Sequence, residues 1–264
     1  MRWVENNFSE SQTKNCELLI RIGEGEFSFA VVDKDQSRIK AIAEVSGSLE
    51  GGFSNEPLLA AGYSATKVAF ETFDFTFIPE ELFKEADVAS YARFINDAGE
   101  KQIVVTDQKS TRIRQVAGIE KGAFQAVHRV FTNPLIFTQA DALIEAAFQI
   151  NSAGDTKLFL NFNSTKFEAL IAEAGSLKFY NSFKIETADD FNYFLLLLLQ
   201  EQKLYLTNPV CFISGDIETG DEYYNRLTKY FNQVEFSKPE LNLPVSENII
   251  PSRFFSLIGL SQCE

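Results

Sequence analysis

The chain has 264 residues, of which 45% are apolar, so it is long enough to form one large domain or two subdomains with a buried core. Its net charge of −13 at pH 7 argues against a nucleic acid or an anionic membrane as partner, because both are bound through basic surfaces. The three cysteines are odd in number and widely separated, so they indicate neither a disulfide framework nor a paired-cysteine metal site, and they favour a cytoplasmic protein.

The first fifteen residues are expected to form a flexible tail, because they contain acidic residues and no apolar stretch of signal-peptide length. Three strands are predicted next, at residues 18–22, 27–32 and 39–45. A glycine turn at 23–26 separates the first two. The three strands form a meander that opens a first subdomain, residues 16–154.

An insertion is expected after this meander. Residues 46–56 are rich in Gly and Ser and predict a loop that leads into a short helix at 57–61. Phenylalanines that alternate with polar residues predict inserted strands near 66–78. Pro79, which is followed by two glutamates, predicts the start of a surface helix that continues towards Ala98.

The rest of the first subdomain alternates strands with helices. The predicted strands are residues 103–106, 113–118 and 135–137, and the predicted helices are residues 121–131 and 140–150. Such alternation is typical of crossover connections on a sheet with parallel neighbours. The polar segment 151–155 is the expected junction with a second subdomain, residues 155–238.

A second meander opens the second subdomain. Its strands are predicted at residues 158–162, 167–172 and 177–183. With an offset of 140 residues, Leu18 aligns with Leu158 and Phe27 with Phe167, and the first two strands match without a gap. This match at the start of each half of the chain indicates a duplicated fold.

A helix is predicted after the second meander, from Ala188 to Gln202, because Thr187 and Asp190 have the spacing of a capping box. The helix is apolar nearly all round, so it needs cover on two sides. The aromatic cluster around it is interpreted as core between sheet and helix, with a groove for a partner as the alternative. Its members are Tyr180, Phe183, Phe191, Tyr193 and Phe194.

The remaining chain completes the second subdomain and adds a C-terminal segment. A buried strand at 210–213 is followed by a helix at 221–231 and a strand at 234–236. The last segment, residues 239–264, contains three prolines and is expected to run extended until a short helix at 252–260. Apolar residues in that helix predict that it docks.

Two meanders, each followed by helices and strands, have the plan of the actin, heat-shock-70 and sugar-kinase superfold. The segments FYNSFKIETADDFNYFLLLLLQEQ, ISGDI and FFSLIGLSQCE resemble more closely a family of unknown function that is common in Bacteroidetes. That resemblance implies an α/β fold of the duplicated actin-like ATPase (ribonuclease H-like) type. The superfold implies ATP with Mg²⁺ as the ligand of its cleft, and the family brings no established activity.

In the superfold, glycine N–H groups of the first hairpin turn face the phosphates, and carboxylates help to hold Mg²⁺. In this chain Gly23 and Gly25 match the turn glycines. The strand before the turn ends near Arg21 rather than at an aspartate, and the nearest acids are Glu24 and Glu26. The usual carboxylate is therefore missing from the first hairpin.

In the second hairpin, Asn161 and Asn163 take the place of the usual Asp-x-Gly pattern, and Ser164 follows them. An amide is a poorer Mg²⁺ ligand than a carboxylate and is no general base near neutral pH. The later turn at Gly215 and Asp216 keeps one of the paired glycines that contact adenosine in the superfold. The candidate nucleotide cleft thus comprises Gly23, Glu24, Gly25, Asn161, Asn163, Ser164, Gly215 and Asp216.

Two other features of the sequence are candidates for catalytic or metal-binding residues. His128 is the single histidine, so a His-based metal cluster or a Ser-His-Asp triad would have to include it, and we interpret it as a helix-surface or boundary residue. Asp189 and Asp190 are interpreted as partners of the helix N-terminus rather than as a cleft acid pair.

Two hypotheses about function follow. The first is a non-catalytic protein with an actin-like fold and degenerate phosphate-binding motifs, which acts by binding another protein through its inserted Phe-rich strand or its C-terminal segment. The alternative is an ATP-binding enzyme of the kinase or ATPase type that uses an unusual acid such as Glu24 or Glu26. A carboxylate that faces the hairpin turns would favour the enzyme.

Overall fold

The computed structural model describes residues 1–47, 51–52, 55–150, 156–239, 241 and 249–264. The expected junction at 151–155 lies outside the described residues, as do parts of the expected loop at 46–56 and of the extended segment after 239. The chain divides into two compact units. Unit 1 comprises Met1–Glu145, Leu241–Ile249 and Leu257–Glu264, and unit 2 comprises Ala146–Glu240 and Ile250–Ser256.

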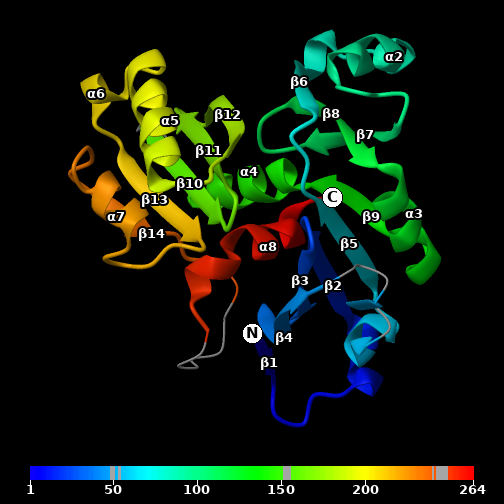
Figure 1. Cartoon of the computed structure of the whole chain (residues 1–264). Helices are drawn as coiled ribbons and strands as arrows, with labels where there is room; N and C mark the ends of the chain where they lie inside the picture. The colour runs from blue at the N-terminus through cyan, green and yellow to red at the C-terminus, as the bar shows by residue number, and fades with distance from the viewer. Residues whose placement is uncertain (48–50, 53–54, 151–155, 240, 242–248) are drawn as a thin grey trace. The chain divides into compact units, whose positions relative to one another are not determined.

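Unit 1 is built on a six-stranded mixed sheet in the order β1-β4-β3-β2-β5-β9 (Figure 1). The strands are β1 (Arg2–Val4), β2 (Cys16–Ile22), β3 (Glu26–Asp33), β4 (Arg38–Ser46), β5 (Ala65–Phe70) and β9 (Leu135–Thr138). β2 pairs antiparallel with β3 and parallel with β5, and β5 pairs parallel with β9. The sequence CELLIRI of β2 is almost entirely buried, as a central strand with a parallel neighbour requires. The predicted first meander is confirmed.

The N-terminal residues are part of this sheet, so the expectation of a flexible tail over residues 1–15 is wrong. β1 pairs antiparallel with β4, and a 3-10 helix, Glu10–Asn15, leads into β2. Ser9 and Gln12 form a capping box at the start of that helix. The Ser-x-x-Gln spacing was the sequence signal for this element.

A second sheet of unit 1 has three antiparallel strands in the order β6-β8-β7. They are β6 (Phe75–Pro79), β7 (Lys101–Gln108) and β8 (Ile113–Glu120). The inserted strands expected near 66–78 divide between the sheets, because β5 joins the large sheet and β6 joins the small one. Parallel neighbours were wrongly predicted for β7 and β8, since the short turn between them permits only an antiparallel pair.

The surface helix expected from Pro79 to Ala98 is also wrong. The segment forms four short elements instead, η3 (Glu80–Leu82), η4 (Glu85–Asp87), α2 (Val88–Tyr91) and η5 (Ala92–Phe94). Most of its side chains are exposed or half-buried. Because most helix stability in proteins comes from packing one apolar face, a segment without such a face does not sustain a long helix.

Two longer helices follow the small sheet, α3 (Lys121–Val130) and α4 (Gln139–Ile150). A short 3-10 helix, η2 (Pro57–Ala60), lies between β4 and β5 in the chain, where a helix was predicted. The core of unit 1 gathers apolar side chains from β2, β3, β4, β5, η2 and α3. This core occupies the face of the large sheet that α3 and η2 cover.

Unit 2 is built on a five-stranded mixed sheet in the order β12-β11-β10-β13-β14. Its strands are β10 (Lys157–Asn163), β11 (Lys166–Glu173), β12 (Ser176–Lys184), β13 (Val210–Gly215) and β14 (Val234–Phe236), and its helices are α5 (Ala188–Glu201), α6 (Leu204–Thr207) and α7 (Glu222–Leu227). The predicted meander and the capping box of Thr187 and Asp190 are confirmed. None of the helices within the described ranges is long and apolar enough to cross a membrane.

The two meanders share their register as well as their strand order. Ile22 pairs with Phe27 in unit 1, and Phe162 pairs with Phe167 in unit 2, so the pairing follows the offset of 140 residues seen in the sequence. Both meanders also carry an irregularity at equivalent places, after Val31 in β3 and after Ile171 in β11. The predicted fold, two subdomains that each open with a three-stranded meander, is therefore present in detail.

Aromatic rings fill the core of unit 2 between the sheet and α5, where the Phe191 ring packs edge-on against those of Phe162 and Phe167. Phe162, Phe167 and Phe191 are buried, and the Phe191 ring centroid lies 5.2 Å from that of Phe162 and 5.1 Å from that of Phe167. The interpretation of Phe191 as part of the core between sheet and helix is confirmed. Tyr193 is the exception, because 63% of it is exposed.

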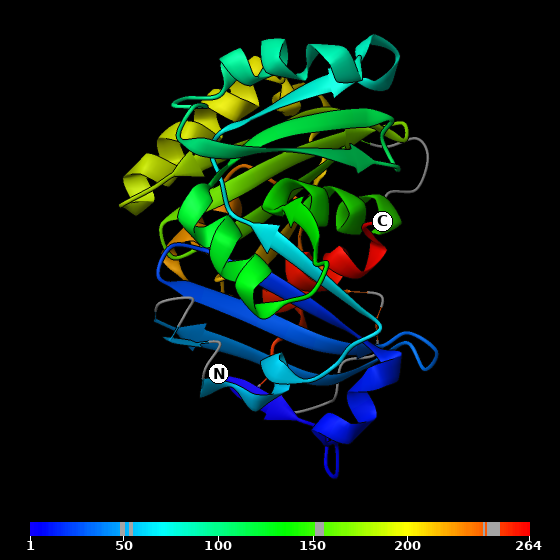
Figure 2. The same cartoon turned by 90° about the vertical axis from the view of Figure 1, so that its right-hand side faces the viewer.

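The C-terminal residues return to unit 1. The last elements are η6 (Pro251–Phe254), α8 (Phe255–Gly259) and η7 (Leu260–Gln262), and η7 lies beside β2 and β5 (Figure 2). The buried Nζ of Lys67 donates to the carbonyl of Ser261 at 2.9 Å, and Lys109 forms an ion pair with Glu264. The predicted docking of this segment is confirmed, and its buried apolar residues are not available to a partner.

Candidate functional site

The first hairpin turn of unit 1 is closed by its own backbone. The Gly23 N–H donates to the Glu26 carbonyl, and the Gly47 N–H donates to the Gly25 carbonyl, both at 2.9 Å. Gly25 has a φ of +74°, which glycine adopts without strain. The Gly23 N–H is therefore engaged within the hairpin, and the side chains of Glu24 and Glu26 are exposed.

A carboxylate that the sequence analysis missed lies over this turn. Glu71 directly follows β5, and its N–H donates to the Ile22 carbonyl at 2.9 Å, which places its side chain beside the end of β2. A Cβ atom added to Gly23 would lie only 2.9 Å from the Glu71 Oε2 atom. The space next to the turn glycine is thus occupied by a negatively charged group.

Arg21 neutralises this carboxylate. The Arg21 guanidinium contacts the Glu71 Oε1 atom at 2.9 Å, and each side chain is only 11% exposed. A half-buried pair of this kind is screened little by solvent and salt. The cation nearest to the turn is therefore already engaged by an anion of the same unit.

The second hairpin turn, in unit 2, is also self-contained. The Asn163 Oδ1 atom accepts from the Ser164 N–H at 2.7 Å and from the Ser164 hydroxyl at 3.4 Å. Asn163 is half-buried and Ser164 is exposed. The Ser164 N–H is therefore engaged by the neighbouring side chain.

Asn161 belongs to a buried polar network that joins four strands. Its Nδ2 donates to Glu168 at 2.7 Å, its Oδ1 accepts from the Ser214 hydroxyl at 2.9 Å, and the Tyr180 hydroxyl donates to Glu168 at 2.5 Å. Asn161 and Glu168 are each 1% exposed. The nitrogen and the oxygen of the Asn161 amide are therefore both hydrogen-bonded inside the sheet. The sequence analysis missed Glu168 as the partner of the nitrogen.

Unit 1 holds a buried carboxylate of its own at the start of α4. Asp141 accepts from the Thr138 N–H at 2.7 Å, from the Thr106 hydroxyl at 2.8 Å and from the Gln108 amide at 3.1 Å. Burial raises the pKa of Asp141, and the hydrogen bonds from Thr138, Thr106 and Gln108 oppose that rise. The group ties α4 to the small sheet and has no exposed oxygen to offer a substrate.

Gly215, the third candidate position, allows two strands of unit 2 to approach closely. Its φ is +82°, and a Cβ atom there would lie 1.9 Å from the Phe162 carbonyl oxygen. The following N–H, that of Asp216, donates to the same carbonyl at 2.9 Å. The glycine is thus required by the fold, whatever else this turn does.

A pocket of about 270 Å³ lies next to this turn within unit 2. It is lined by Gly215, Asp216, Ile217, Glu218, Asp221, Ile250 and Arg253. Three of these residues are acids, and the Arg253 guanidinium contacts the Asp216 Oδ1 atom at 2.8 Å. Asp221 accepts from the Tyr224 N–H at 2.6 Å, so it also occupies the N-terminus of α7. The lining is suited to an uncharged or basic group rather than to a phosphate.

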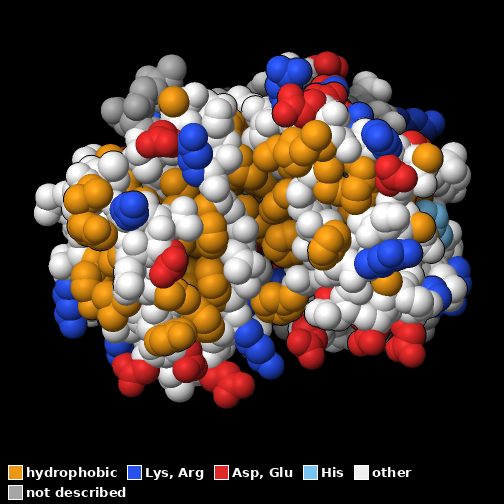
Figure 3. Space-filling model, turned by 90° about the horizontal axis from the view of Figure 1, so that it is seen from above, with side chains coloured by type: hydrophobic (Ala, Val, Ile, Leu, Met, Phe, Trp, Pro, Cys, Tyr) orange, Lys and Arg blue, Asp and Glu red, His pale blue; other side chains and the backbone are white. Residues whose placement is uncertain are grey.

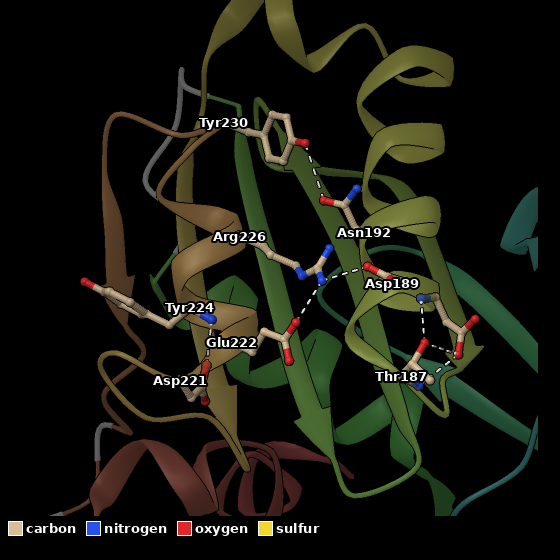
Figure 4. A network of polar contacts seen from close by, with 9 residues as sticks. Thr187, Asp189, Asn192, Asp221, Glu222, Tyr224, Arg226 and Tyr230 are labelled. Carbon is tan, nitrogen blue, oxygen red and sulfur yellow. Dashed lines mark hydrogen bonds and ion pairs between the residues drawn. The ribbon is translucent and has the colours of Figure 1, made fainter.

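A polar network on the surface of unit 2 joins α5 to α7 (Figure 4). Arg226 of α7 reaches between Asp189 of α5 and Glu222, with a distance of 2.8 Å to an oxygen of each, and the Tyr230 hydroxyl donates to Asn192 at 3.4 Å. Asp189 lies in the first turn of α5, and the sequence analysis did not anticipate its ion pair with Arg226 of α7. The network fixes the two helices side by side.

Asp190 gives a prediction for pH dependence. The N–H of Glu186 and the hydroxyl and N–H of Thr187 donate to its carboxylate and lower the pKa of Asp190. A depressed pKa in the folded state adds stability above the unfolded pKa, which is about 3.9 for aspartate, and that stability is lost as pH falls through the folded value. We expect Asp190→Asn to be less stable than wild type at pH 7 in urea unfolding, with a difference that shrinks as pH falls below about 4. A constant difference would contradict this role.

His128 lies on the exposed side of α3, as predicted. Its Nδ1 lies 3.0 Å from the Phe124 carbonyl, and its ring stacks on that of Phe124 with centroids 4.2 Å apart. Throughout the described ranges, no group of three or more His, Cys, Asp or Glu residues is placed to hold a metal ion.

The two hairpin turns do not fit ATP with Mg²⁺. A phosphate over the first turn would meet the Glu71 carboxylate, and the second turn offers exposed Ser164 and half-buried Asn163 in place of a carboxylate. No chemical step on a nucleotide is therefore derived from these residues.

Within the described part of unit 2, an apolar surface on α5 and α6 is exposed. It is formed by Tyr193, Leu196 and Leu197 of α5 with Tyr205 and Leu206 of α6, and we call it the α5–α6 surface. Figure 3 shows hydrophobic side chains gathered over the part of the molecule that carries these helices. The sequence analysis expected α5 to need cover on two sides, and the second side is exposed.

Residues 5–234 match the model of a family described as Protein of unknown function (DUF3822). No curated protein matches the chain. The resemblance to a family without established activity, which the motifs from Phe179 onward indicated, is confirmed.

Solved structures show the fold. A protein from Bacteroides thetaiotaomicron VPI-5482, described as having an actin-like ATPase fold and unknown function, superposes with a TM-score of 0.81 at 19% identity, over 97% of this chain and 99% of that one. The PilM-PilN type IV pilus biogenesis complex gives 0.65 at 13% identity, over 93% and 97%. An inorganic polyphosphate/ATP-glucomannokinase from Arthrobacter sp. strain KM gives 0.50 at 12% identity, over 94% and 97%. The chain has the actin-like ATPase fold.

Proposed function

The chain belongs to the family described as Protein of unknown function (DUF3822), and from that premise we propose that it is a non-catalytic, protein-binding module with an actin-like ATPase fold. Fold alone does not select this function, because folds of this kind carry many activities. The proposal rests on the residues of the two hairpin turns and on the uncovered face of α5.

The observation that carries the proposal is the position of Glu71. Its carboxylate lies beside Gly23, where the superfold places terminal phosphates. Two like charges about 4 Å apart repel by roughly 4 kcal/mol near a protein surface. The Arg21 guanidinium, which is paired with the same carboxylate, offsets part of this repulsion, but the Glu71 side chain still occupies the space beside Gly23 that a phosphate would need.

The second hairpin supports the same conclusion. A phosphotransferase or ATPase needs a group that orients the nucleophile or holds the metal. Asn161 is engaged on both sides of its amide, and its partner Glu168 is buried within the sheet. Neither side chain is placed to serve as a general base.

The protein-binding half of the proposal is supported by the α5–α6 surface. Monomeric proteins seldom leave clustered large apolar side chains exposed unless the cluster has a partner. PilM, whose structure resembles this chain, is present in a complex with PilN. The likeness supports the view that this fold serves as a scaffold for protein binding.

A second candidate function is that of an ATP-binding enzyme of the kinase or ATPase type. The observation that favours it is the pocket beside Gly215, the turn that the resemblance matches to the adenosine-contacting turn of the superfold. The acid available to such an enzyme would be Glu24 or Glu26 at the first turn, or Glu71 after release from Arg21. An uncharged group such as adenosine suits the acidic lining of this pocket better than a phosphate does.

A thermal-shift titration with ATP, ADP and adenosine, each with and without Mg²⁺, tests the proposal. A ligand that binds the native state must raise the melting temperature with its concentration. We expect no shift with ATP or ADP at millimolar concentration. A shift that grows with ATP would contradict the proposal, and a shift with adenosine alone would assign ligand binding to the pocket beside Gly215.

Two variants identify the group that excludes nucleotide. Glu71→Gln removes the charge beside Gly23 and releases Arg21, so we expect a shift with ATP that the wild type lacks. Glu24→Gln removes the same charge from an exposed position of the same turn and is expected to leave the response absent. Equal responses of the two variants would show that Glu71 is not the excluding group.

A further inference from the structure

The α5–α6 surface has the geometry of a helix-binding site. Tyr193, Leu196 and Leu197 have the spacing i, i+3 and i+4, so they form one ridge along α5. The ridge lies opposite Phe191, Leu195 and Leu198, which face the core. α5 is therefore apolar on two opposite faces, and the sheet covers only one of them.

The short helix α6 enlarges this surface. It is preceded by Lys203 and followed by Asn208, and both residues have positive φ, at 53° and 42°. Leu204 is buried, whereas Tyr205 and Leu206 are 66% and 70% exposed. Non-glycine residues in this left-handed conformation cost energy, so the chain holds two strained residues to present an apolar turn to solvent.

The surrounding charges select among partners. Acidic residues bracket the surface, with Glu186 before the ridge and Glu201 after it, both exposed, while Asp189 is already paired with Arg226. Lys203 is the one cation between the start of α5 and the end of α6. A partner that carries Lys or Arg at both ends of an apolar stripe would meet complementary charge.

The same charges disfavour two other occupants. A second copy of the chain would bring another net charge of −13 against this one. An anionic bilayer would be repelled in the same way, because surface helices that bind such bilayers carry basic residues. The i, i+3, i+4 ridge matches the groove of a packed helix rather than an extended strand.

We propose that the α5–α6 surface binds a basic amphipathic helix of another protein. This inference rests on the proposed function, since it names the partner class of the protein-binding module. A helix of about 14 residues, as long as α5, extends over about 21 Å and would cover the ridge and α6 together. Apolar side chains of the partner helix at i, i+4 and i+7 would lie along the ridge, and its basic ends would face Glu186 and Glu201.

The test uses a synthetic 14-residue peptide of Leu and Lys in which the Leu residues follow helical spacing, labelled for fluorescence anisotropy. We expect the full chain to bind it with a dissociation constant of about 10 μM. A scrambled peptide of the same composition, without a helical stripe, is expected to bind at least about tenfold more weakly. Equal binding of the two peptides would overturn the proposal, because it would indicate charge attraction alone.

Matched variants locate the site. Leu197→Ser and Leu206→Ser lie on the α5–α6 surface and are each expected to weaken peptide binding about tenfold. Leu82→Ser and Phe94→Ser remove apolar side chains of unit 1 that are 63% and 77% exposed, and are expected to leave it unchanged. All four positions are on the surface, so each variant is expected to fold. Equal loss in both pairs would overturn the assignment.

Two further measurements examine the alternative occupants. Sedimentation of the full chain alone is expected to report a monomer, and flotation with anionic phosphatidylserine vesicles is expected to leave the protein unbound. Self-association or flotation that Leu197→Ser abolishes would replace the proposed helix with a second copy or a membrane. The nucleotide titrations separate the two proposals, because a shift with ATP would overturn the non-catalytic function whether or not the peptide binds.

Discussion

Replacing Gly215 with alanine is expected to lower the free energy of unfolding by about 4 kcal/mol, the sum of backbone strain and a steric clash. The φ of +82° strains any residue with a Cβ atom, and this Cβ atom would lie 1.9 Å from the Phe162 carbonyl oxygen. Since the obstacle is backbone of the neighbouring strand β10, β13 must move away from it. Urea unfolding followed by far-UV circular dichroism measures the loss.

Gly220→Ala is the matched control for this change. Gly220 also has a positive φ, +90°, but a Cβ atom there would have no other atom within 4 Å. Only strain remains, which costs about 1 to 2 kcal/mol. Equal losses at Gly215 and Gly220 would contradict the close approach of β13 to β10.

Glu168→Ala is the second change with a large expected effect, a loss of about 3 to 4 kcal/mol. The change deletes the acceptor for the Asn161 amide and the Tyr180 hydroxyl, which stay buried without it. Buried donors without acceptors cost more than the hydrogen bond itself contributes. Urea unfolding at neutral pH measures the effect.

Glu173→Ala is the control, because it removes the same side chain from the other end of β11. Glu173 lies at the surface, where it contacts Lys178 at 3.5 Å, and such pairs contribute less than about 1 kcal/mol. The double variant Asn161→Ala with Glu168→Ala is expected to lose less stability than the sum of the two single variants, because removing either residue alone leaves the other buried without its partner. Additive losses would contradict a shared network.

Local patterns in the sequence predicted the local structure well. Alternation of apolar residues located both meanders, and the offset of 140 residues predicted even their common register. The Thr187 capping box located the start of α5. These features depend on residues that are close together in the chain, so the spacing of apolar residues and the identity of turn and capping residues are sufficient to predict them.

The failures in the fold depended on distant contacts. Residues 2–4 carry no strong strand signal, and they form β1 because β4 offers an edge with which to pair. The segment after Pro79 has good helix formers but no face to bury, so it breaks into short turns. In both places tertiary packing, rather than the intrinsic propensity of the residues, determined the secondary structure.

The candidate site was predictable only in part. The absence of aspartates from both hairpins is visible in the sequence, and it supported a non-catalytic role. The pairing of Arg21 with Glu71 depends on the parallel register of β2 and β5, which no local pattern specifies. Glu168 lies on the face of β11 opposite to Phe167, and the sequence gives no sign that this face is buried as well.

The return of residues 257–264 to unit 1 has a consequence for synthesis on the ribosome. Unit 1 contains the earliest residues of the chain and also residues that follow unit 2. The strands of unit 2 therefore leave the ribosome before residues 257–264 do, and they can pair with one another while unit 1 is still incomplete. Until then Lys67, buried in the folded protein, is without the Ser261 carbonyl that it binds there. Unit 1, whose translation begins first, is completed last, so it can fold completely only after all of unit 2 has been synthesised.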